Sequence, residues 1–151
     1  KEVIDYFSDS KNRYSVATQC GYLETVSIKP WGDMVAKFDT GNSVYSVIHG
    51  EDIKISGNKV SFTLMGKRKT YPLEKTYNVK VGSIRRHNEE RPVIKLDIEF
   101  AGSLYREELF GIDDRTEMGT EVLLTRRIMT EMNIMVNPAR KYVVTTKYSL
   151  D

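Results

Sequence analysis

A regular alternation of apolar and polar residues is the sequence feature that most restricts the fold. It is clearest in VIKLDIEF, residues 93–100, where apolar residues alternate with Lys95, Asp97 and Glu99. Because successive side chains of a strand point to opposite faces, this pattern predicts a strand with one buried and one hydrated face. Shorter versions of the pattern occur in YLETVSI (22–28), MVAKFDT (34–40), KVSFTLM (59–65) and TYNVKV (76–81). The chain is therefore predicted to be mainly all-β.

Turn-forming residues separate these segments, at Pro30-Trp31-Gly32, at Ser56-Gly57-Asn58 and at Gly66. Short strands with such turns predict a small antiparallel sheet that closes into a barrel or folds over on itself. A chain of 151 residues with 40% hydrophobic content can bury one core. We therefore predict a single domain at residues 16–151, preceded by an extended or poorly ordered arm at residues 1–15.

One helix is predicted, within TEVLLTRRIMTEMN at residues 120–133. Leu124, Ile128 and Met132 recur there at four-residue steps, which places them on one helical face. The segment after it, IMVNPARKYVVTT, predicts two strands around a turn at Asn137-Pro138-Ala139-Arg140.

Composition restricts the partners and the location. Lys and Arg number 23 against 21 Asp and Glu, so the formal charge of +2 creates no broad field that would favour nucleic acid or an acidic membrane. The sequence has neither an apolar stretch of membrane-spanning length nor a signal-peptide pattern. Cys20 is the single cysteine, which excludes an internal disulfide. These features predict a soluble protein of the cytoplasm without a nucleic-acid or membrane partner, and no motif in the sequence predicts a cofactor or a bound metal.

Asp39, Thr40 and Gly41 stand directly after a strand-like run of residues. Asp and Gly are common in tight turns, so the tripeptide is explained by local structure alone. The other interpretation is that the Asp39 carboxylate is presented to a substrate. The tripeptide by itself does not decide between a turn and a catalytic group.

Four segments in order resemble the retropepsin-like aspartic proteases, and more closely the group labelled ATP-dependent zinc proteases. Any one of these segments is a weak match, but the shared order makes chance agreement improbable. The resemblance covers about residues 21–146. The segments that carry it are GYLETVSI (21–28), AKFDTGNSVYSVIHG (36–50), EERPVIKLDIEF (89–100) and DDRTEMGTEVLLTRR (113–127).

The resemblance implies that Asp39 is a catalytic carboxylate and that the protein is a homodimeric endopeptidase. Aspartic proteases place two carboxylates around one water, and two like charges at that distance share a proton. Since the chain carries one such tripeptide, the second Asp39 would come from a second copy across a two-fold axis. Thr40 would link the two loops across this axis, and Gly41 would allow a sharp turn. The substrate would be an extended peptide or protein segment.

The resemblance also gives supporting roles to residues near the two motifs. Asn42 and Ser43 follow the tripeptide, and Leu124, Thr125 and Arg126 stand at the second motif. Arg126 would tie the start of the helix to the active-site loop. Thr125 occupies a position where the family has glycine, and Asn42 one where it usually has Ala or Ser. These departures keep a second hypothesis open, that the domain is catalytically silent and serves as a structural or interaction module in a cellular complex or viral particle.

In the family, a hairpin between the two motifs covers the substrate as a flap, which we expect between residues 56 and 77. Other sites have less support in the sequence. Cys20, His49 and His87 match no compact zinc-binding spacing, and a nucleophilic pair of Cys20 and His49 lacks an evident orienting group. The GKRKT segment at residues 66–70 lacks the upstream glycine of a phosphate-binding loop.

Overall fold

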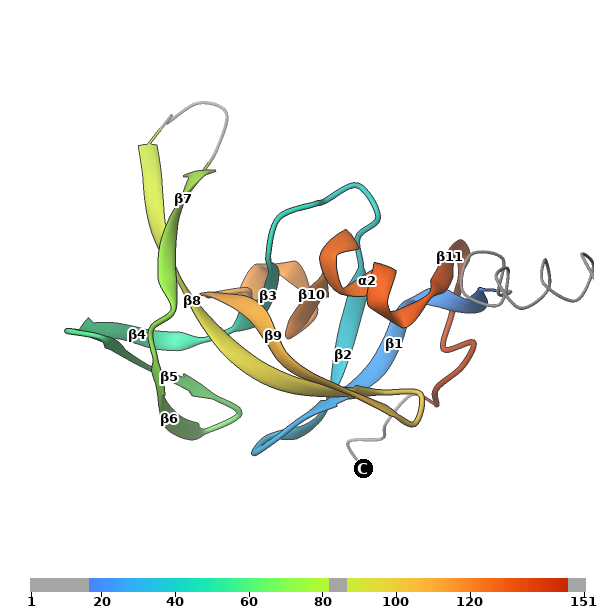
Figure 1. The fold of residues 1–151 in the computed structure, drawn as a ribbon, viewed down its shortest axis with the longest axis horizontal. Coiled ribbons are helices and arrows are strands. Elements are labelled where there is room, and N and C mark those ends of the chain that lie inside the picture. The colour runs from blue at the N-terminus through green and yellow to red at the C-terminus, as the bar shows by residue number, and fades with distance from the viewer. Residues whose placement is uncertain (1–16, 82–86, 147–151) are drawn as a thin grey trace, which may run out of the picture.

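The computed structural model describes residues 17–81 and 87–146 (Figure 1). The arm predicted at residues 1–15 lies outside these described residues. The first six strands are β1 (Thr18–Ile28), β2 (Gly32–Phe38), β3 (Ser46–His49), β4 (Glu51–Ser56), β5 (Lys59–Leu64) and β6 (Lys67–Pro72). They are followed by β7 (Lys75–Val81), β8 (His87–Phe100), β9 (Ser103–Asp113), the 3₁₀-helix η1 (Thr116–Met118), β10 (Val122–Leu124), α2 (Arg126–Met132) and β11 (Ile134–Lys141). The prediction of a mainly all-β fold is confirmed.

Eight strands form one mixed sheet in the order β11-β1-β2-β10-β3-β9-β8-β7. A further pairing joins the end of β1 to β8, with Ser27 opposite Glu99 and Ile28 opposite Ile98. This pairing curls the sheet around its own core, so that it closes partly into a ring instead of forming an even barrel. In Figure 1 the β8–β9 hairpin crosses β1 and β2 near the turn that joins these two strands, where β1 pairs with β8.

The alternation in β8 sorts its side chains as predicted. Ile94, Leu96, Ile98 and Phe100 are at most 4% exposed, whereas the intervening residues 95, 97 and 99 are exposed. The apolar face of β8 packs into the main core, which explains why its polar residues are confined to the other face.

A second sheet, β4-β5-β6, closes another part of the core. Val60, Phe62 and Leu64 of β5 are at most 1% exposed. The rings of Phe62 and Tyr71 lie 5.5 and 6.0 Å from that of Trp31, measured between centroids. Trp31 belongs to the turn between β1 and β2, so this sheet packs at the end of β2 that is remote from Asp39.

The predicted helix begins later than the sequence pattern indicates. Residues 122–124 form β10, which lies between β2 and β3, and α2 starts only at Arg126. Val122 and Leu124 are fully buried in this position. A short apolar run of this kind fits a helix or a buried strand equally well. Here it forms a strand, because β2 and β3 pair with it on both sides. No helix in the described part of the chain is long and apolar enough to cross a membrane.

The prediction of two strands around a turn at residues 137–140 is wrong. β11 runs continuously from Ile134 to Lys141, parallel to β1. The register between the two strands shifts between Gly21 and Leu23, close to Pro138, which has no N–H to donate. Pairing with β1 therefore accommodates the proline as an irregularity within the strand.

The segment after β11 is fixed to the fold by Glu24 of β1, whose side chain is fully buried. Its Oε2 accepts from the backbone nitrogens of Gly21, Val143 and Val144, at 2.6, 2.9 and 3.4 Å. Its Oε1 accepts from the backbone nitrogen and the hydroxyl of Thr145, at 3.0 and 2.6 Å. Glu24 thus satisfies the polar groups of a segment about 120 residues away in sequence.

Candidate active site

Asp39 stands directly after β2, at the start of the loop formed by residues 39–45, which leads to β3. β10 runs parallel to β2, with Leu124 opposite Phe38. Parallel neighbours end at the same edge of a sheet, so the residues that follow each strand meet there. The backbone nitrogen of Asp39 donates to the Leu124 oxygen at 2.9 Å. In Figure 1 the loop lies beside α2. The two motifs of the sequence are therefore adjacent in space.

One oxygen of the Asp39 carboxylate supports the local turn. The backbone nitrogen of Gly41 donates to Asp39 Oδ1 at 3.0 Å, and that of Asn42 donates to the Asp39 carbonyl at 3.3 Å. Within the described residues, Oδ2 has no hydrogen-bond partner, and the side chain is partly exposed. Thr40 is exposed at the tip of the turn. Asp39 therefore stabilises the turn through Oδ1, while Oδ2 faces outward.

Gly41 does not need the conformational freedom of glycine that the sequence suggested. Its φ lies outside the left-handed region, and a Cβ placed on it would lie 3.4 Å from Asp39 Oδ1, an ordinary contact. The structure thus offers no steric reason within one chain for glycine at this position.

The second motif holds the loop through hydrogen bonds to its backbone. The backbone nitrogen of Arg126 donates to the Asn42 oxygen at 2.9 Å, which is the predicted tie between helix start and loop. The side-chain bond comes from the next residue, since Arg127 Nε donates to the Ser43 oxygen at 3.1 Å. The Arg126 side chain is exposed and has no hydrogen bond or ion pair among the described residues. The arginine pair was visible in the sequence, but which of the two side chains turns toward the loop was not.

Thr125 fits without strain where the family pattern has glycine. Its φ and ψ of −111° and 178° are those of extended backbone, which any residue adopts. The side chain is fully buried, and its hydroxyl donates to the Val44 oxygen. The Thr125 backbone nitrogen donates to Ser46 Oγ at 3.2 Å. Thr125 is therefore a further link between the second motif and the loop.

Asn42, the milder departure from the family pattern, stabilises the loop from within. Its Oδ1 accepts from the backbone nitrogen of Val44 at 2.8 Å, an Asx-type turn. Together with the bonds from Thr125, Arg126 and Arg127, this turn fixes the backbone from Asp39 to Val44.

The hairpin beside this loop is β7–β8, whereas the flap was expected between residues 56 and 77. A pocket of about 400 Å³ lies between the loop and this hairpin. The loop side contributes Asn42, Val44 and Tyr45, and β7 contributes Tyr77, Asn78 and Val79. The β5–β6 hairpin packs Phe62 and Tyr71 against Trp31, at the end of β2 that is remote from this loop.

Tyr45 is a residue of this site that the sequence did not single out. Its side chain is 9% exposed, and the Arg127 guanidinium carbon lies 4.6 Å from its ring centroid. Hydrogen bonding with Lys75 lowers the pKa of Tyr45, and the positive charges of Lys75 and Arg127 act in the same direction. A tyrosine among serines and valines gives no sign in the sequence that two cations will flank it.

The alternative constellations are not assembled as reactive sites. Burial, with a smaller contribution from Glu24, raises the pKa of the Cys20 thiol to about 11, which opposes formation of a nucleophilic thiolate. His49 is engaged elsewhere, because its Nδ1 accepts from the Arg115 nitrogen at 2.8 Å and its Nε2 lies 3.3 Å from Glu51. The His87 side chain lies outside the described part of the structure. Among the described residues, no group of three or more His, Cys, Asp and Glu side chains is arranged to hold a metal.

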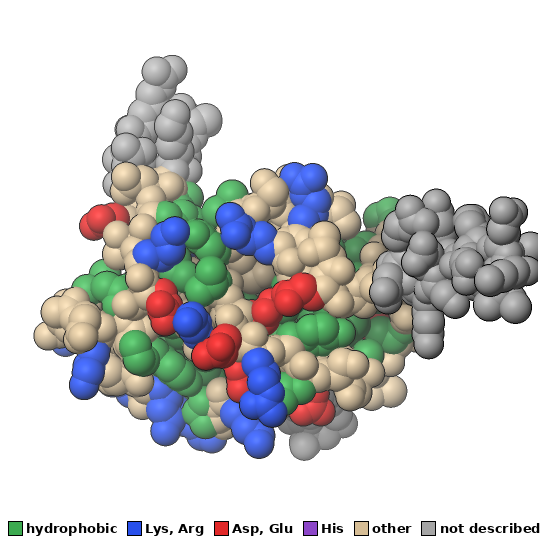
Figure 2. All heavy atoms as spheres, viewed as in Figure 1, with side chains coloured by type: hydrophobic (Ala, Val, Ile, Leu, Met, Phe, Trp, Pro, Cys, Tyr) green, Lys and Arg blue, Asp and Glu red, His purple; other side chains and the backbone are tan. Residues whose placement is uncertain are grey.

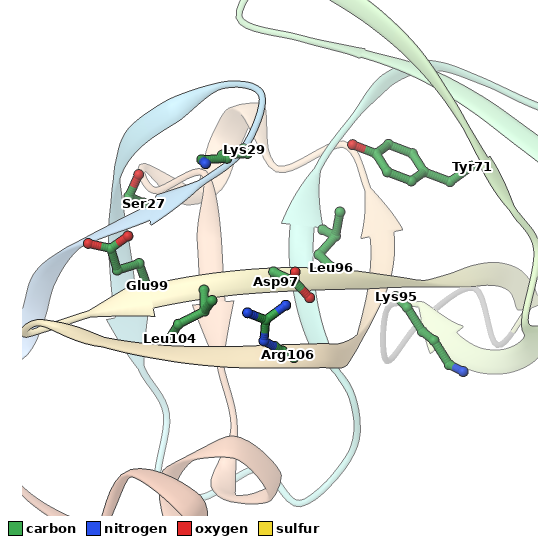
Figure 3. Close-up of a pocket in the computed structure, with 9 residues that line it drawn as sticks. All are labelled: Ser27, Lys29, Tyr71, Lys95, Leu96, Asp97, Glu99, Leu104 and Arg106. Atoms are coloured by element: carbon green, nitrogen blue, oxygen red, sulfur yellow. The ribbon is translucent and has the colours of Figure 1, made fainter.

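The remaining surface does not point to a second centre of the same chemistry. A pocket of about 460 Å³ lies over β8 and β9, where Figure 3 shows basic side chains such as Lys29 and Arg106 together with Asp97 and Glu99. None of the predicted site residues lines it. On the face drawn in Figure 2, basic and acidic side chains are interspersed. The predicted motifs converge only at the loop that carries Asp39.

Comparison with known proteins decides the family. A model of the RimB-like family, described as retropepsin-like aspartic endopeptidase RimB, matches residues 19–147. The chain belongs to this family. The description mentions neither zinc nor ATP, and it covers both motifs that meet at Asp39. None of the curated protein sequences compared with the chain matches it.

A solved structure shares the fold. It is the crystal structure of Lpg0085 from Legionella pneumophila subsp. pneumophila str. Philadelphia 1, described as a protein with unknown function (DUF785). The two chains are 22% identical, with a TM-score of 0.65, and the match covers 85% of this chain and 98% of the other. At this identity the similarity establishes the fold.

Proposed function

We propose that the protein is a homodimeric aspartic endopeptidase in which Asp39 of each copy activates a shared water. The observation that carries this proposal is the state of Asp39. One carboxylate oxygen is fixed by the Gly41 nitrogen, and the other faces outward from a loop whose backbone is fixed by the second motif. A carboxylate with fixed orientation and a free oxygen is what general acid–base catalysis requires. Membership in the RimB-like family supports the same chemistry.

In the proposed mechanism, a two-fold axis brings the free oxygens of two Asp39 side chains to one water. The pair holds a single proton, because two adjacent carboxylates do not both remain ionised. The ionised carboxylate takes a proton from the water as its oxygen attacks the scissile carbonyl carbon, and the protonated one gives its proton to the carbonyl oxygen. Collapse of the resulting diol breaks the C–N bond, and the leaving nitrogen receives a proton from the pair.

The surrounding elements suit an extended substrate in this proposal. The β7–β8 hairpin would cover the peptide, and the pocket between hairpin and loop would hold a substrate side chain. Val44, Val79 and Leu123 provide apolar lining there, beside the charged groups of Arg91 and Asp113. Such a combination of apolar walls and a few polar groups is typical of ligand sites.

A catalytically silent module remains the second candidate, and a specific observation favours it. The Gly41 bond gives Asp39 a structural use that would retain the residue without any reaction. In that case, the loop and hairpin would serve an interaction in a cellular complex or a viral particle.

The Asp39→Asn variant separates the two candidates. Asn retains the acceptor for the Gly41 nitrogen, so we expect unfolding within about 1 kcal/mol of wild type. We expect wild type to cleave a peptide library, followed by mass spectrometry, fastest on the acidic side of neutrality, and the variant to cleave nothing. Asp33→Asn, on the exposed face of β2, is the matched control and should retain activity.

Sedimentation at the assay concentration tests the shared site. We expect wild type and Asp39→Asn to be dimers. Cleavage by a strictly monomeric wild type would contradict the two-copy mechanism. A dimer that cleaves nothing from acidic to neutral pH would favour the silent module.

A further inference from the structure

The side chain of Tyr45 is in contact with groups from two elements, α2 and β7. The Arg127 guanidinium from α2 lies on its ring, with the carbon 4.6 Å from the centroid. The Tyr77 ring from β7 meets it edge-on, at 5.1 Å between centroids and 66° between planes. The Lys75 ammonium, also from β7, lies 5.3 Å from the same centroid. Tyr45 therefore contacts both the helix that supports the loop and the hairpin beside it.

The hydroxyl and the aromatic ring of Tyr45 make different kinds of interaction. The Tyr45 hydroxyl forms a hydrogen bond with Lys75 of β7, whose ammonium lies beside the ring. The ring attracts the Arg127 guanidinium through its electron-rich face, while Arg127 Nε donates to the Ser43 oxygen. One cation thus joins the ring to the loop backbone, and the other joins the hydroxyl to β7.

The opposite side of the hairpin has its own anchor. Arg91 of β8 donates to Asp113 of β9 at 2.8 Å and to the Tyr77 hydroxyl at 3.3 Å. Gly111 leaves room for this arrangement, since a Cβ there would lie 2.8 Å from the Tyr77 hydroxyl and 3.0 Å from Arg91 Cδ. The base of the hairpin is therefore attached to β9 on one side, and through Tyr45 to the loop on the other.

We propose that Tyr45 is a positioning residue that couples the β7–β8 hairpin to the loop carrying Asp39. Its hydroxyl holds β7 through Lys75, and its ring holds α2 and the loop through Arg127. These contacts hold the hairpin in place over the loop that carries Asp39. The effect on catalysis rests on the proposed endopeptidase function, whereas the mechanical coupling does not.

Tyr45→Phe tests the coupling, because it removes the hydroxyl and keeps the ring. We expect backbone amides of β7, and of the part of β8 paired with it, to exchange hydrogen about fivefold to tenfold faster, the factor expected for loss of one side-chain hydrogen bond. Amides of β1 and β2 serve as the internal reference, since general destabilisation would accelerate them as well. Tyr105→Phe, at a partly buried tyrosine of β9, is the matched control and should leave the hairpin unchanged.

Lys75→Met examines the other partner of the same bond. We expect it to accelerate exchange in β7 as much as Tyr45→Phe does, and the double variant to add nothing further. Additive effects of the two substitutions, or unchanged exchange in Tyr45→Phe, would overturn the proposal.

Kinetics extend the test to the reaction. We expect Tyr45→Phe to raise KM several-fold with kcat nearly unchanged, because a loosened hairpin binds the peptide less well. A merely structural defect would lower the fraction of active enzyme, which reduces kcat and leaves KM unchanged; that result would overturn the coupling. If wild type cleaves nothing, the proposed function fails, and the exchange measurements still decide whether Tyr45 couples hairpin and loop.

Discussion

Glu24→Gln is the perturbation that most directly tests how the end of the described chain is held. The buried carboxylate accepts five hydrogen bonds, from Gly21, Val143 and Val144 at one oxygen and from the nitrogen and hydroxyl of Thr145 at the other. Glutamine replaces one of these oxygens with an amide nitrogen, which donates and does not accept. The substitution changes the size of the side chain little, so its effect reports on acceptors and charge.

The magnitude follows from the better of the two amide orientations. With the amide nitrogen facing Thr145, the hydroxyl rotates and accepts, but the Thr145 backbone N–H is left unpaired, at a cost of about 1 to 3 kcal/mol. The bonds at the other oxygen lose their charge assistance, roughly 0.5 to 1 kcal/mol for each of the two short ones. Relief from burying a charge offsets part of this loss. We expect Glu24→Gln to lower the free energy of unfolding by about 2 to 4 kcal/mol.

Urea denaturation followed by circular dichroism measures this difference. Glu117→Gln, at an exposed position of η1, is the matched control and should remain within about 0.5 kcal/mol of wild type. Proteolysis should cut the segment at residues 142–146 first in Glu24→Gln, because its backbone bonds to Glu24 are weakened. A Glu24→Gln protein as stable as the control would refute the reasoning that the carboxylate holds this segment.

Two further predictions concern the support of α2. Thr125→Gly removes the hydroxyl bond to Val44 and a buried methyl group, so we expect it to lower the unfolding free energy by about 1.5 to 3 kcal/mol in thermal denaturation and not to raise cleavage. Thr125→Ser, which keeps the hydroxyl, should lose less, and faster cleavage by Thr125→Gly at unchanged stability would show that the side chain obstructs the loop. Burial first, and then hydrogen bonding and repulsion from Glu131, raise the pKa of Glu108 from 4.5 to about 8. Because the folded state binds this proton more tightly than the unfolded state, its contribution to stability is complete below pH 4.5 and is lost as the pH rises toward 8. As the pH rises from 4.5 to 8, the free energy of unfolding of Glu108→Gln should therefore increase by about 1 kcal/mol relative to that of wild type, a value reduced for solvent screening. A difference between the two proteins that does not change with pH would contradict this prediction.

The sequence alone predicted the class of fold and the two motifs that meet at the loop carrying Asp39. The alternation in residues 93–100 depends only on the two-residue period of a strand, and this is why the buried face of β8 was identified correctly. Asp39 and Thr125 were selected from local motifs and a family resemblance. These signals are contained in short stretches of chain, so no distant contact was needed to recognise them.

Pairing between distant strands overruled some of the local signals. The apolar run from Val122 to Leu124 suits a helix as well as a buried strand. It forms the strand β10 because it pairs with β2 on one side and β3 on the other. The turn expected around Pro138 became an irregularity within β11, because β1 pairs with the strand on both sides of it, at Asn137 and at Lys141. In both cases, neighbouring strands satisfied backbone groups that the local pattern assigned to another structure.

Only the tertiary structure gave Glu24 and Tyr45 their roles and chose the hairpin beside the site. Glu24 reads in the sequence as a polar residue of an alternating strand, and its donors lie as far away as Thr145. Tyr45 depends on cations from β7 and α2, which are separate in the chain. The interaction of a charged or polar group is set by the atoms around it after folding, whereas its tendency to form a strand or a turn is set by its immediate neighbours. The sequence therefore determined the elements and the motifs, and the packing of those elements decided which polar groups act together.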